Sequence, residues 1–395
     1  MKFLFENHEI DIDRRELRRG AEPLDIEPQV FDLLVYLIRH RDRVVSKDDL
    51  IEGVWHGRIV SESALTSRIS AARKAVGDDG DAQRLIRTVP RKGLRFVGAV
   101  REGASMVAEP PPKAAIARTQ EIRFCTSPDG TRIAHASVGE GPPLLKAANW
   151  LSHLEHDWEG PIWTDLLQAL AAKNRLVRYD ARGNGLSDWD VRDISFEAFV
   201  QDLESVVAAT GVSRFPLFGI SQGCAVSIAY AVRHPERVER LVLYGGFARG
   251  KRHRGSQEMI DQSYAALTLM RQGWGTDNPA FRQFFTSLFI PDGTPDQMRW
   301  WNEVQRRTAS PENAARIRDV VDDIDVEELL PQVRVPTLVL HCRDDAVAPF
   351  EEGRRMAAGI PGARFVALEG RNHIITSSDP SWNRFVDAIG KFLAQ

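Results

Sequence analysis

A serine set between two glycines is the first residue of this chain that could do chemistry. Ser221 lies in Gly219-Ile220-Ser221-Gln222-Gly223, which follows an apolar run and leads into residues that are apolar at helical spacing. This pattern predicts a strand, a tight turn and a helix, with a strained serine backbone and an exposed hydroxyl at the turn. Ser221 is therefore a candidate nucleophile for acyl transfer. The alternative is an ordinary strand-to-helix turn without a catalytic role.

A base and an acid for this serine stand further along the chain. A serine nucleophile needs a base that takes its proton and an acid that orients the base. A strand-like apolar run precedes Asp344 and Asp345, and a second such run precedes His373. We therefore expect His373 to be the base and one of the two aspartates to be the acid.

Several segments around these residues resemble the α/β hydrolase superfamily. The serine segment matches its nucleophile elbow, the three candidates follow its order of serine, acid and histidine, and Asp180-Ala-Arg-Gly-Asn-Gly-Leu-Ser187 matches its Asp-x-Arg-Gly-x-Gly-x-Ser turn. The resemblance covers residues 120–395. It implies a doubly wound, mostly parallel sheet with crossover helices, and a structural role for the Arg-Gly turn.

The resemblance also assigns roles that the residues alone leave open. The family places its acid four residues before the proline that is here Pro349, which favours Asp345 over its neighbour as the third member of a catalytic triad. It implies that the backbone N–H groups of Gln222 and Trp150 stabilise the oxyanion. Relatives usually have His-Gly where this chain has Ala148-Asn149, so the oxyanion loop departs from the family pattern. No metal and no cofactor is expected.

An insertion interrupts the alternation of strands and helices between about residues 247 and 330. The segment is helical in pattern and is expected to form a lid above the sheet. It carries a series of aromatic residues, some of which are expected to line a mostly apolar pocket while others pack against the core. These residues are Tyr264, Trp274, Phe281, Phe284, Phe285, Phe289, Trp300 and Trp301.

Residues 1–101 show a different pattern. Short alternating bursts at the start predict three or four small strands, and three helices follow that begin near Pro28, Ser46 and Glu62. Two strands joined by a basic glycine turn, within residues 84–97, complete the domain. The pattern predicts a winged helix of the α+β class.

This domain resembles the OmpR/PhoB-type DNA-binding domain. The resemblance rests on Pro28-Gln-Val-Phe-Asp-Leu-Leu34, Arg43-Val-Val-Ser46, Leu50-Ile-Glu-Gly-Val-Trp55, Ile69-Ser-Ala-Ala-Arg-Lys-Ala-Val-Gly-Asp-Asp79 and Leu85-Ile-Arg-Thr-Val-Pro-Arg-Lys-Gly-Leu-Arg-Phe96. In that family the third helix enters the major groove and the wing reaches the minor groove. The resemblance implies double-stranded DNA as a partner, contacted by Ser63, Thr66, Ser67, Arg68, Ser70, Arg73, Lys74, Thr88, Arg91 and Lys92. Base preference cannot be transferred, because Ala71 and Pro90 stand where relatives often have arginines.

Charge and composition limit the remaining possibilities. Residues 63–95 hold eight basic and three acidic side chains, although the whole chain has a net charge of −3. Such a patch can bind phosphates, while a solvated face or a surface for protein contacts is the alternative.

Residues 102–119 are rich in proline and alanine and predict a linker. No signal peptide opens the chain and no apolar run is long enough to span a bilayer, so we expect a cytoplasmic protein without a membrane partner.

These predictions describe a one-component transcription regulator that acts as a homodimer. Its hydrolase domain would bind, and in the stronger form of the hypothesis hydrolyse, a small apolar ester, lactone or acyl compound. The second hypothesis is a serine esterase whose DNA-binding domain only localises it or regulates its own gene. A third is a binding module in which the hydrolase domain merely dimerises the protein.

Overall fold

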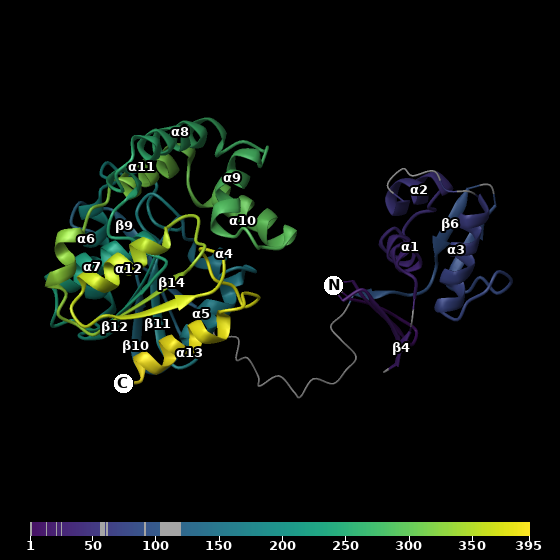
Figure 1. Cartoon of the computed structure of the whole chain (residues 1–395), viewed down its shortest axis with the longest axis horizontal. Coiled ribbons are helices and arrows are strands. Elements are labelled where there is room, and N and C mark those ends of the chain that lie inside the picture. The colour runs from purple at the N-terminus through teal and green to yellow at the C-terminus, as the bar shows by residue number, and fades with distance from the viewer. Residues whose placement is uncertain are drawn as a thin grey trace. The chain divides into compact units, whose positions relative to one another are not determined.

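In the computed structural model the chain forms two compact units, Met1–Ile116 and Ala117–Gln395, each with its own hydrophobic core (Figure 1). The structure describes residues 2–12, 14–20, 22–24, 26–55, 60, 62–90, 92–102 and 120–395. Of the predicted linker, residues 102–119, only residue 102 falls within this part.

The N-terminal unit is a winged helix, as the sequence predicted. Its elements are β1 (Lys2–Phe5), β2 (His8–Asp11), β3 (Glu16–Arg19), β4 (Glu22–Leu24), α1 (Pro28–Arg39), α2 (Lys47–Trp55), α3 (Glu62–Ala75), β5 (Ile86–Val89), β6 (Gly93–Phe96) and β7 (Arg101–Glu102). The first sheet has the order β4-β3-β2-β1-β7, with antiparallel pairing throughout. Strands β5 and β6 form a separate antiparallel hairpin, which is the wing.

Local sequence signals place the three helices of this unit. Pro28 occupies the first position of α1, where its missing N–H costs nothing. The hydroxyl of Ser46 accepts from the N–H of Asp49 (3.0 Å), and the Asp49 carboxylate accepts from the N–H of Ser46 (2.9 Å), which forms a capping box ahead of α2. Gly77, with φ +67°, follows the end of α3. Because each signal involves neighbouring residues, the sequence predicted these boundaries closely.

The C-terminal unit is an eight-stranded α/β sheet. Its strands are β8 (Glu121–Thr126), β9 (Arg132–Val138), β10 (Pro143–Lys146), β11 (Arg175–Tyr179), β12 (Phe215–Ile220), β13 (Val238–Tyr244), β14 (Thr337–Cys342) and β15 (Arg364–Leu368). The helices outside the insertion are α4 (Leu154–Glu159), α5 (Thr164–Ala171), α6 (Phe196–Thr210), α7 (Gln222–Arg233), α12 (Phe350–Gly359) and α13 (Trp382–Leu393). The order is β15-β14-β13-β12-β10-β11-β9-β8, and the pairings of β9 alone are antiparallel. The predicted doubly wound, mostly parallel sheet is confirmed.

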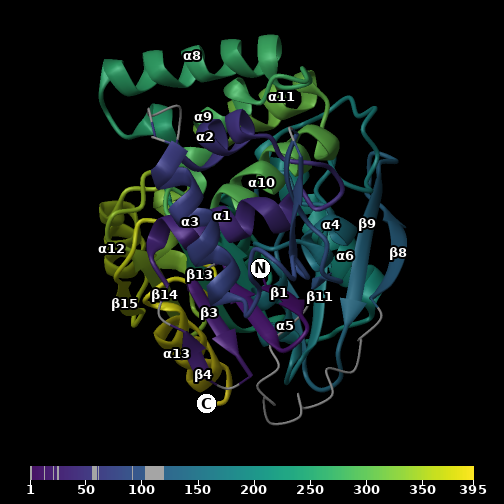
Figure 2. The same ribbon diagram turned by 90° about the vertical axis from the view of Figure 1, so that its right-hand side faces the viewer.

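A helical insertion lies between β13 and β14, where the sequence predicted a lid. It comprises η1 (Lys251–His253), α8 (Gln257–Gly273), α9 (Ala280–Phe289), α10 (Pro295–Thr308), α11 (Pro311–Asp322) and η2 (Glu327–Gln332). Its four long helices gather on the side of the sheet away from α13, as Figure 1 and Figure 2 show. Among the helices in the described ranges, none is long and apolar enough to cross a membrane.

Two helices, α4 and α5, lie between β10 and β11. Gly160 follows the shorter helix, α4, and separates it from α5. A side chain at Gly160 would collide with the ring of Trp300, which belongs to α10 of the insertion. Gly160 and Pro161 are a local helix-breaking pair that ends α4, and the glycine also leaves room for the ring of Trp300.

The Arg-Gly turn, residues 180–187, ties the loop after β11 to α6. Arg182 is fully buried and pairs with the carboxylate of Asp202, also fully buried, over 2.7 Å. A second carboxylate, that of Asp129, lies 2.6 Å from the guanidinium. These contacts fit the structural role that the resemblance implied for the turn.

Candidate active site and nucleic-acid interface

Ser221 stands at the sharp turn between β12 and α7. Its backbone has φ +54° and ψ −129°, in a region that residues other than glycine seldom adopt. Its N–H donates to the carbonyl of Tyr244 at the end of β13 (3.0 Å). A side chain at Gly219 would collide with the first turn of α7, and a Cβ at Gly223 would come within 2.7 Å of the carbonyl oxygen of Ala148. The predicted strand, turn and helix are present, and both glycines are needed for the close approach.

His373 and Asp345 form a buried pair. Nδ1 of His373 donates to Oδ2 of Asp345 over 2.7 Å, and the two side chains are 1% and 0% exposed. Because Nδ1 carries the donated proton, the neutral ring has a bare nitrogen at Nε2. That nitrogen is buried, and within the described part of the chain it has no hydrogen-bond partner. A histidine held in this tautomer can accept a proton at Nε2.

Asp345 is anchored through its other oxygen as well. Oδ1 accepts from the N–H groups of Val347 (2.8 Å) and Ala348 (3.0 Å). Burial opposes ionisation of the carboxyl, but the charge and the hydrogen bond of His373 outweigh it and hold the pKa of Asp345 below its ordinary value. Asp344 is exposed instead. Of the two aspartates that the sequence left open, Asp345 is the one that contacts the histidine.

Gly245 brings the serine and the histidine to the same strand end. It follows Tyr244, whose carbonyl binds the N–H of Ser221. A Cβ at Gly245 would lie 3.4 Å from Cε1 of His373 and 3.6 Å from Oδ2 of Asp345. The imidazole therefore packs directly over the backbone that holds the serine turn.

A second histidine, His341, belongs to this site and was not predicted. It lies at the end of β14, where Nε2 donates to the carbonyl of Ala348 (2.8 Å) and stands 3.7 Å from Oδ2 of Asp345. Burial lowers the pKa of His341 and favours its neutral form. The position of His341, four residues before Asp345, was the one sequence signal that could have indicated a place in the site. A histidine at the end of a buried strand is, however, also common as a core residue.

The predicted oxyanion donors, Gln222 and Trp150, follow the neighbouring strands β12 and β10. Gln222 opens α7, so its backbone N–H has no partner within the helix. The ring of Trp150 stacks on Phe289, with centroids 6.3 Å apart, and Phe289 packs edge-on against His373 at 5.4 Å. The two predicted donors therefore lie at the strand ends that surround the serine turn.

Asn149, where the chain departs from the family pattern, has a charged partner. Its side-chain oxygen accepts a hydrogen bond from Nζ of Lys146. Lys146 is fully enclosed, and burial lowers the pKa of its ammonium to about 8. This buried contact fixes the loop that leads to Trp150, and no sequence motif pointed to it.

A cavity of about 200 Å³ lies between Ser221 and the lid. It is lined by Ser221, Phe247, Lys251, Arg254, Met259, Gln262, Leu288, Phe289, Arg318, Val321, Asp322, Ala346, Val347 and Pro349. Since Ser221 is only 5% exposed, a ligand would reach it through this cavity. Eight of the lining residues are apolar, but the cavity is more polar than the sequence predicted, because three cationic side chains of the lid also line it.

The aromatic residues of the lid have different surroundings, and Tyr264 and Phe284 are exposed. Phe289 lines the cavity. Three others are buried in the core of the unit, namely Trp274, Phe285 and Trp301. The expectation that some of the series would line the pocket therefore holds for Phe289.

In the N-terminal unit, helix α3 turns its predicted DNA face outward. Its inner face packs into the core through Leu65 and Ala72, and Val76, which follows the helix, is buried as well. The exposed members of the predicted contact set, on α3 and the wing, are Thr66, Ser67, Ser70, Lys74, Thr88 and Lys92. Arg91 and the side chain of Ser63 lie outside the described residues.

The two arginines predicted on this helix face have partners within the protein. Arg73 donates to the carbonyl of Ile86 (3.1 and 3.2 Å) and to the hydroxyl of Thr88 (2.8 Å). Arg68 pairs with the carboxylate of Glu27. Arg73 thus joins α3 to the wing strand β5, a contact that the helical pattern did not reveal.

Comparison with known proteins identifies both units. Residues 21–96 match the family "Transcriptional regulatory protein, C terminal", and residues 154–380 match the family "alpha/beta hydrolase fold". The non-heme chloroperoxidase CPO-A1 of Kitasatospora aureofaciens is 27% identical over 284 residues, which cover 68% of this chain and 98% of the relative. The pimeloyl-[acyl-carrier protein] methyl ester esterase of Nitrosomonas europaea is 27% identical over 242 residues, covering 60% and 90%.

A solved structure gives the same result. A hydrolase from Pseudomonas aeruginosa PA01 superimposes with a TM-score of 0.57 at 25% identity, over 70% of this chain and 99% of that one. The chain therefore belongs to the α/β hydrolase family and carries an OmpR/PhoB-type winged-helix DNA-binding domain at its N-terminal end.

Proposed function

We propose that the protein is a DNA-binding regulator whose hydrolase domain binds and hydrolyses a small ester or related acyl compound. The observation that carries the proposal is the buried pair of His373 and Asp345, whose free Nε2 lies at the same strand end as Ser221. A base in the correct tautomer beside a strained serine is the arrangement that acyl transfer requires.

The reaction follows from this geometry. Oγ of Ser221 attacks the ester carbonyl carbon while Nε2 of His373 takes the hydroxyl proton, and Asp345 stabilises the resulting imidazolium. The N–H groups of Gln222 and Trp150 donate to the oxyanion. The C–O bond of the leaving alcohol then breaks, and the alcohol receives the proton from His373. A water molecule attacks the acyl-serine in the same way, releases the acid and restores the serine.

The winged helix gives this chemistry a regulatory use. A ligand changes affinity for DNA only if it binds the DNA-competent state and the other state with different affinity. The proposed regulator acts in the cytoplasm as a homodimer on repeated half-sites. Hydrolysis would then remove the ligand to which the protein responds.

A serine esterase with a merely localising or autoregulatory winged helix is the second candidate. It is favoured by the similarity to a relative that is named as a methyl ester esterase. The two candidates differ in one measurable quantity, because in an esterase of this kind no ligand of the cavity would change promoter affinity. A hydrolase domain that only dimerises the protein would show neither turnover nor a ligand effect.

Mass spectrometry after fluorophosphonate treatment tests the proposed chemistry. The reagent modifies activated serines, so the full-length protein is expected to be labelled stoichiometrically at Ser221. The label should be absent from Ser221→Ala and strongly reduced in His373→Ala. A folded wild-type protein that takes up no label at Ser221 would contradict a working nucleophile.

A further inference from the structure

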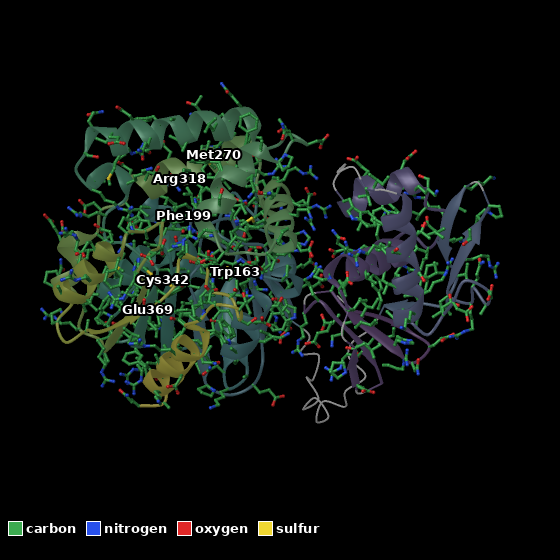
Figure 3. The ribbon with its side chains drawn as sticks, turned by 45° about the vertical axis from the view of Figure 1, so that its right-hand side comes forward. Trp163, Phe199, Met270, Arg318, Cys342 and Glu369 are labelled. Carbon is green, nitrogen blue, oxygen red and sulfur yellow. The ribbon has the colours of Figure 1, made fainter. Side chains whose placement is uncertain are left out.

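Three cationic side chains of the lid surround the cavity above the serine. Lys251 belongs to η1, Arg254 follows this short helix, and Arg318 lies on α11. Figure 3 shows Arg318 below Met270 of α8, on the side of the lid that faces the sheet. The three are called the lid cation cluster here, and all of them line the same cavity as Ser221.

A single carboxylate faces this cluster within the cavity lining. Asp322 lies 2.9 Å from the guanidinium of Arg318, and its other oxygen accepts from the hydroxyl of Ser263 (2.6 Å). Both oxygens of Asp322 are therefore occupied. The cavity lining therefore carries three cationic side chains and one carboxylate, while the buried carboxylates of Glu352 and Asp345, which do not line the cavity, also act on Arg254.

Lys251 is the cation that most clearly lacks a counter-charge. In the described structure its ammonium makes neither a hydrogen bond nor an ion pair, although the residue is only partly exposed. Burial and the neighbouring charge of Arg318 lower the pKa of Lys251. Removing a charge from water without a partner is unfavourable, so an anion beside this ammonium would be strongly stabilised.

Arg254 is also without a carboxylate partner among the described residues. Its guanidinium donates to the carbonyls of Arg249 (2.9 Å) and Val347 (3.5 Å), and it lies 5.0 Å above the ring centre of Phe247. These contacts orient the planar group without neutralising it. An arginine held in this way can bind a carboxylate or phosphate with two parallel hydrogen bonds.

We propose that the lid cation cluster binds an anionic group of the substrate, so that the substrate class is short acyl esters carrying a carboxylate or phosphate away from the scissile bond. This assignment rests on the proposed hydrolase function and narrows it. The ester carbonyl lies at Ser221, the anion lies at Lys251 and Arg254, and the apolar wall that includes Phe289 holds the short chain between them. The small volume of the cavity, about 200 Å³, limits the chain length.

Selectivity between matched esters tests the assignment. The probes are the monomethyl and dimethyl esters of succinate, glutarate and adipate, which differ in one negative charge, and the readout is the ratio of kcat/KM for monoester over diester. At the best chain length we expect this ratio to exceed about 10 in the full-length protein and to fall about tenfold in Lys251→Met, as for the loss of one charge-assisted contact. Lys251→Arg should retain most of the preference, because it keeps the charge.

Arg271→Met is the matched control for this series. Arg271 is a lid cation on α8 that does not line the cavity, and its side chain is 49% exposed. The ratio should be unchanged in this variant. A wild-type preference for the diesters, or an equal fall of the ratio in Arg271→Met and Lys251→Met, would overturn the assignment.

A binding measurement separates this assignment from the proposed hydrolysis. Calorimetry on the Ser221→Ala protein measures binding without turnover. The anion site predicts that this protein binds a monoester more tightly than its diester, and that the difference is lost when Lys251→Met is added. This result supports the anion site even where the wild type cleaves neither ester. In that case only the proposed hydrolysis fails. Equal binding of both esters, or none at millimolar concentration, overturns the anion site. Competition by inorganic phosphate or by the free dicarboxylate then tells which anion is preferred.

Discussion

The backbone carbonyl of Phe289 accepts a hydrogen bond from the N–H of His373 (2.9 Å). The ring of the same phenylalanine packs edge-on against the imidazole, with centroids 5.4 Å apart. Because Phe289 is the last residue of α9, the end of a lid helix holds the loop of the candidate base. A ligand that moves the lid would therefore also move His373, so binding and chemistry are expected to be coupled.

Phe289→Ala should lower kcat by about 10- to 100-fold, because His373 would lose the ring that holds its orientation. Phe289 is 3% exposed, so the cavity created should also reduce the free energy of unfolding by about 3 kcal/mol. Ester kinetics and urea unfolding check the two effects. Phe284→Ala on the same helix is the control, since Phe284 is 49% exposed and should tolerate the change.

Asp345→Asn should reduce kcat by about 10³- to 10⁴-fold, because an amide facing Nδ1 favours the wrong tautomer of His373. Asp344→Asn should leave kcat unchanged, since Asp344 is exposed and does not contact the histidine. Steady-state ester hydrolysis by the two variants checks this. A greater loss in Asp344→Asn would show that the neighbouring aspartate is the acid.

The preference for anionic esters should decline as pH rises through the pKa of Lys251. Burial and Arg318 hold this pKa below its ordinary value of 10.5, with Arg254 also lowering it and Asp322 opposing them. Below the pKa the ammonium is charged and attracts the anion, and above it the amine is neutral. The monoester-to-diester ratio, measured between about pH 6 and pH 10, should fall in the wild type and stay flat in Lys251→Arg, whose guanidinium remains protonated.

Arg182→Met should reduce the free energy of unfolding of the hydrolase unit by about 3–5 kcal/mol, because it leaves the carboxylate of Asp202 buried without its partner. Arg132→Met breaks the pair with Asp188, but the Arg132 side chain is 70% exposed and the loss should be much smaller. Unfolding of both variants in guanidinium chloride measures the two free energies. Similar losses would contradict the structural role of the Arg-Gly turn.

Replacing Lys74 and Lys92 together by alanine should weaken binding to duplex DNA of unrelated sequence and reduce the slope of log affinity against log salt by about 2. Both lysines are exposed, one on α3 and one in the turn of the wing. Fluorescence anisotropy over a salt series measures the slope. Lys391→Ala, which removes one positive charge from α13, should leave the slope unchanged, and a fall there would point to a general charge effect.

Features encoded by neighbouring residues were predictable from the sequence. The capping box of Ser46 and Asp49 and the glycines around Ser221 act within one turn of the chain, so their residue types alone indicate the local structure. The Ser-Asp-His order located the candidate acid and base because each follows a strand-like apolar run. Contact between His373 and Asp345 required the parallel neighbours β14 and β15, which the fold resemblance implied.

Features that depend on distant segments were not predictable. Lys251 and Arg318 lie on separate lid segments and converge only because η1 and α11 pack on the same cavity. Helical spacing places Arg73 on the outward side of α3. The spacing does not show whether such an arginine contacts DNA or, as in this structure, donates to the carbonyl of Ile86.

The positive charge of Lys251 and Arg254 bears on what happens after bond cleavage. Hydrolysis of an ester releases a proton and leaves a carboxylate, so the acid has one more negative charge than the ester from which it formed. A cavity lined by three cationic side chains and one carboxylate holds the more negative molecule longer. Slow release of the product would prolong the occupied state beyond the chemical step. The protein would then stay in its ligand-bound state for some time after the ester itself has been consumed.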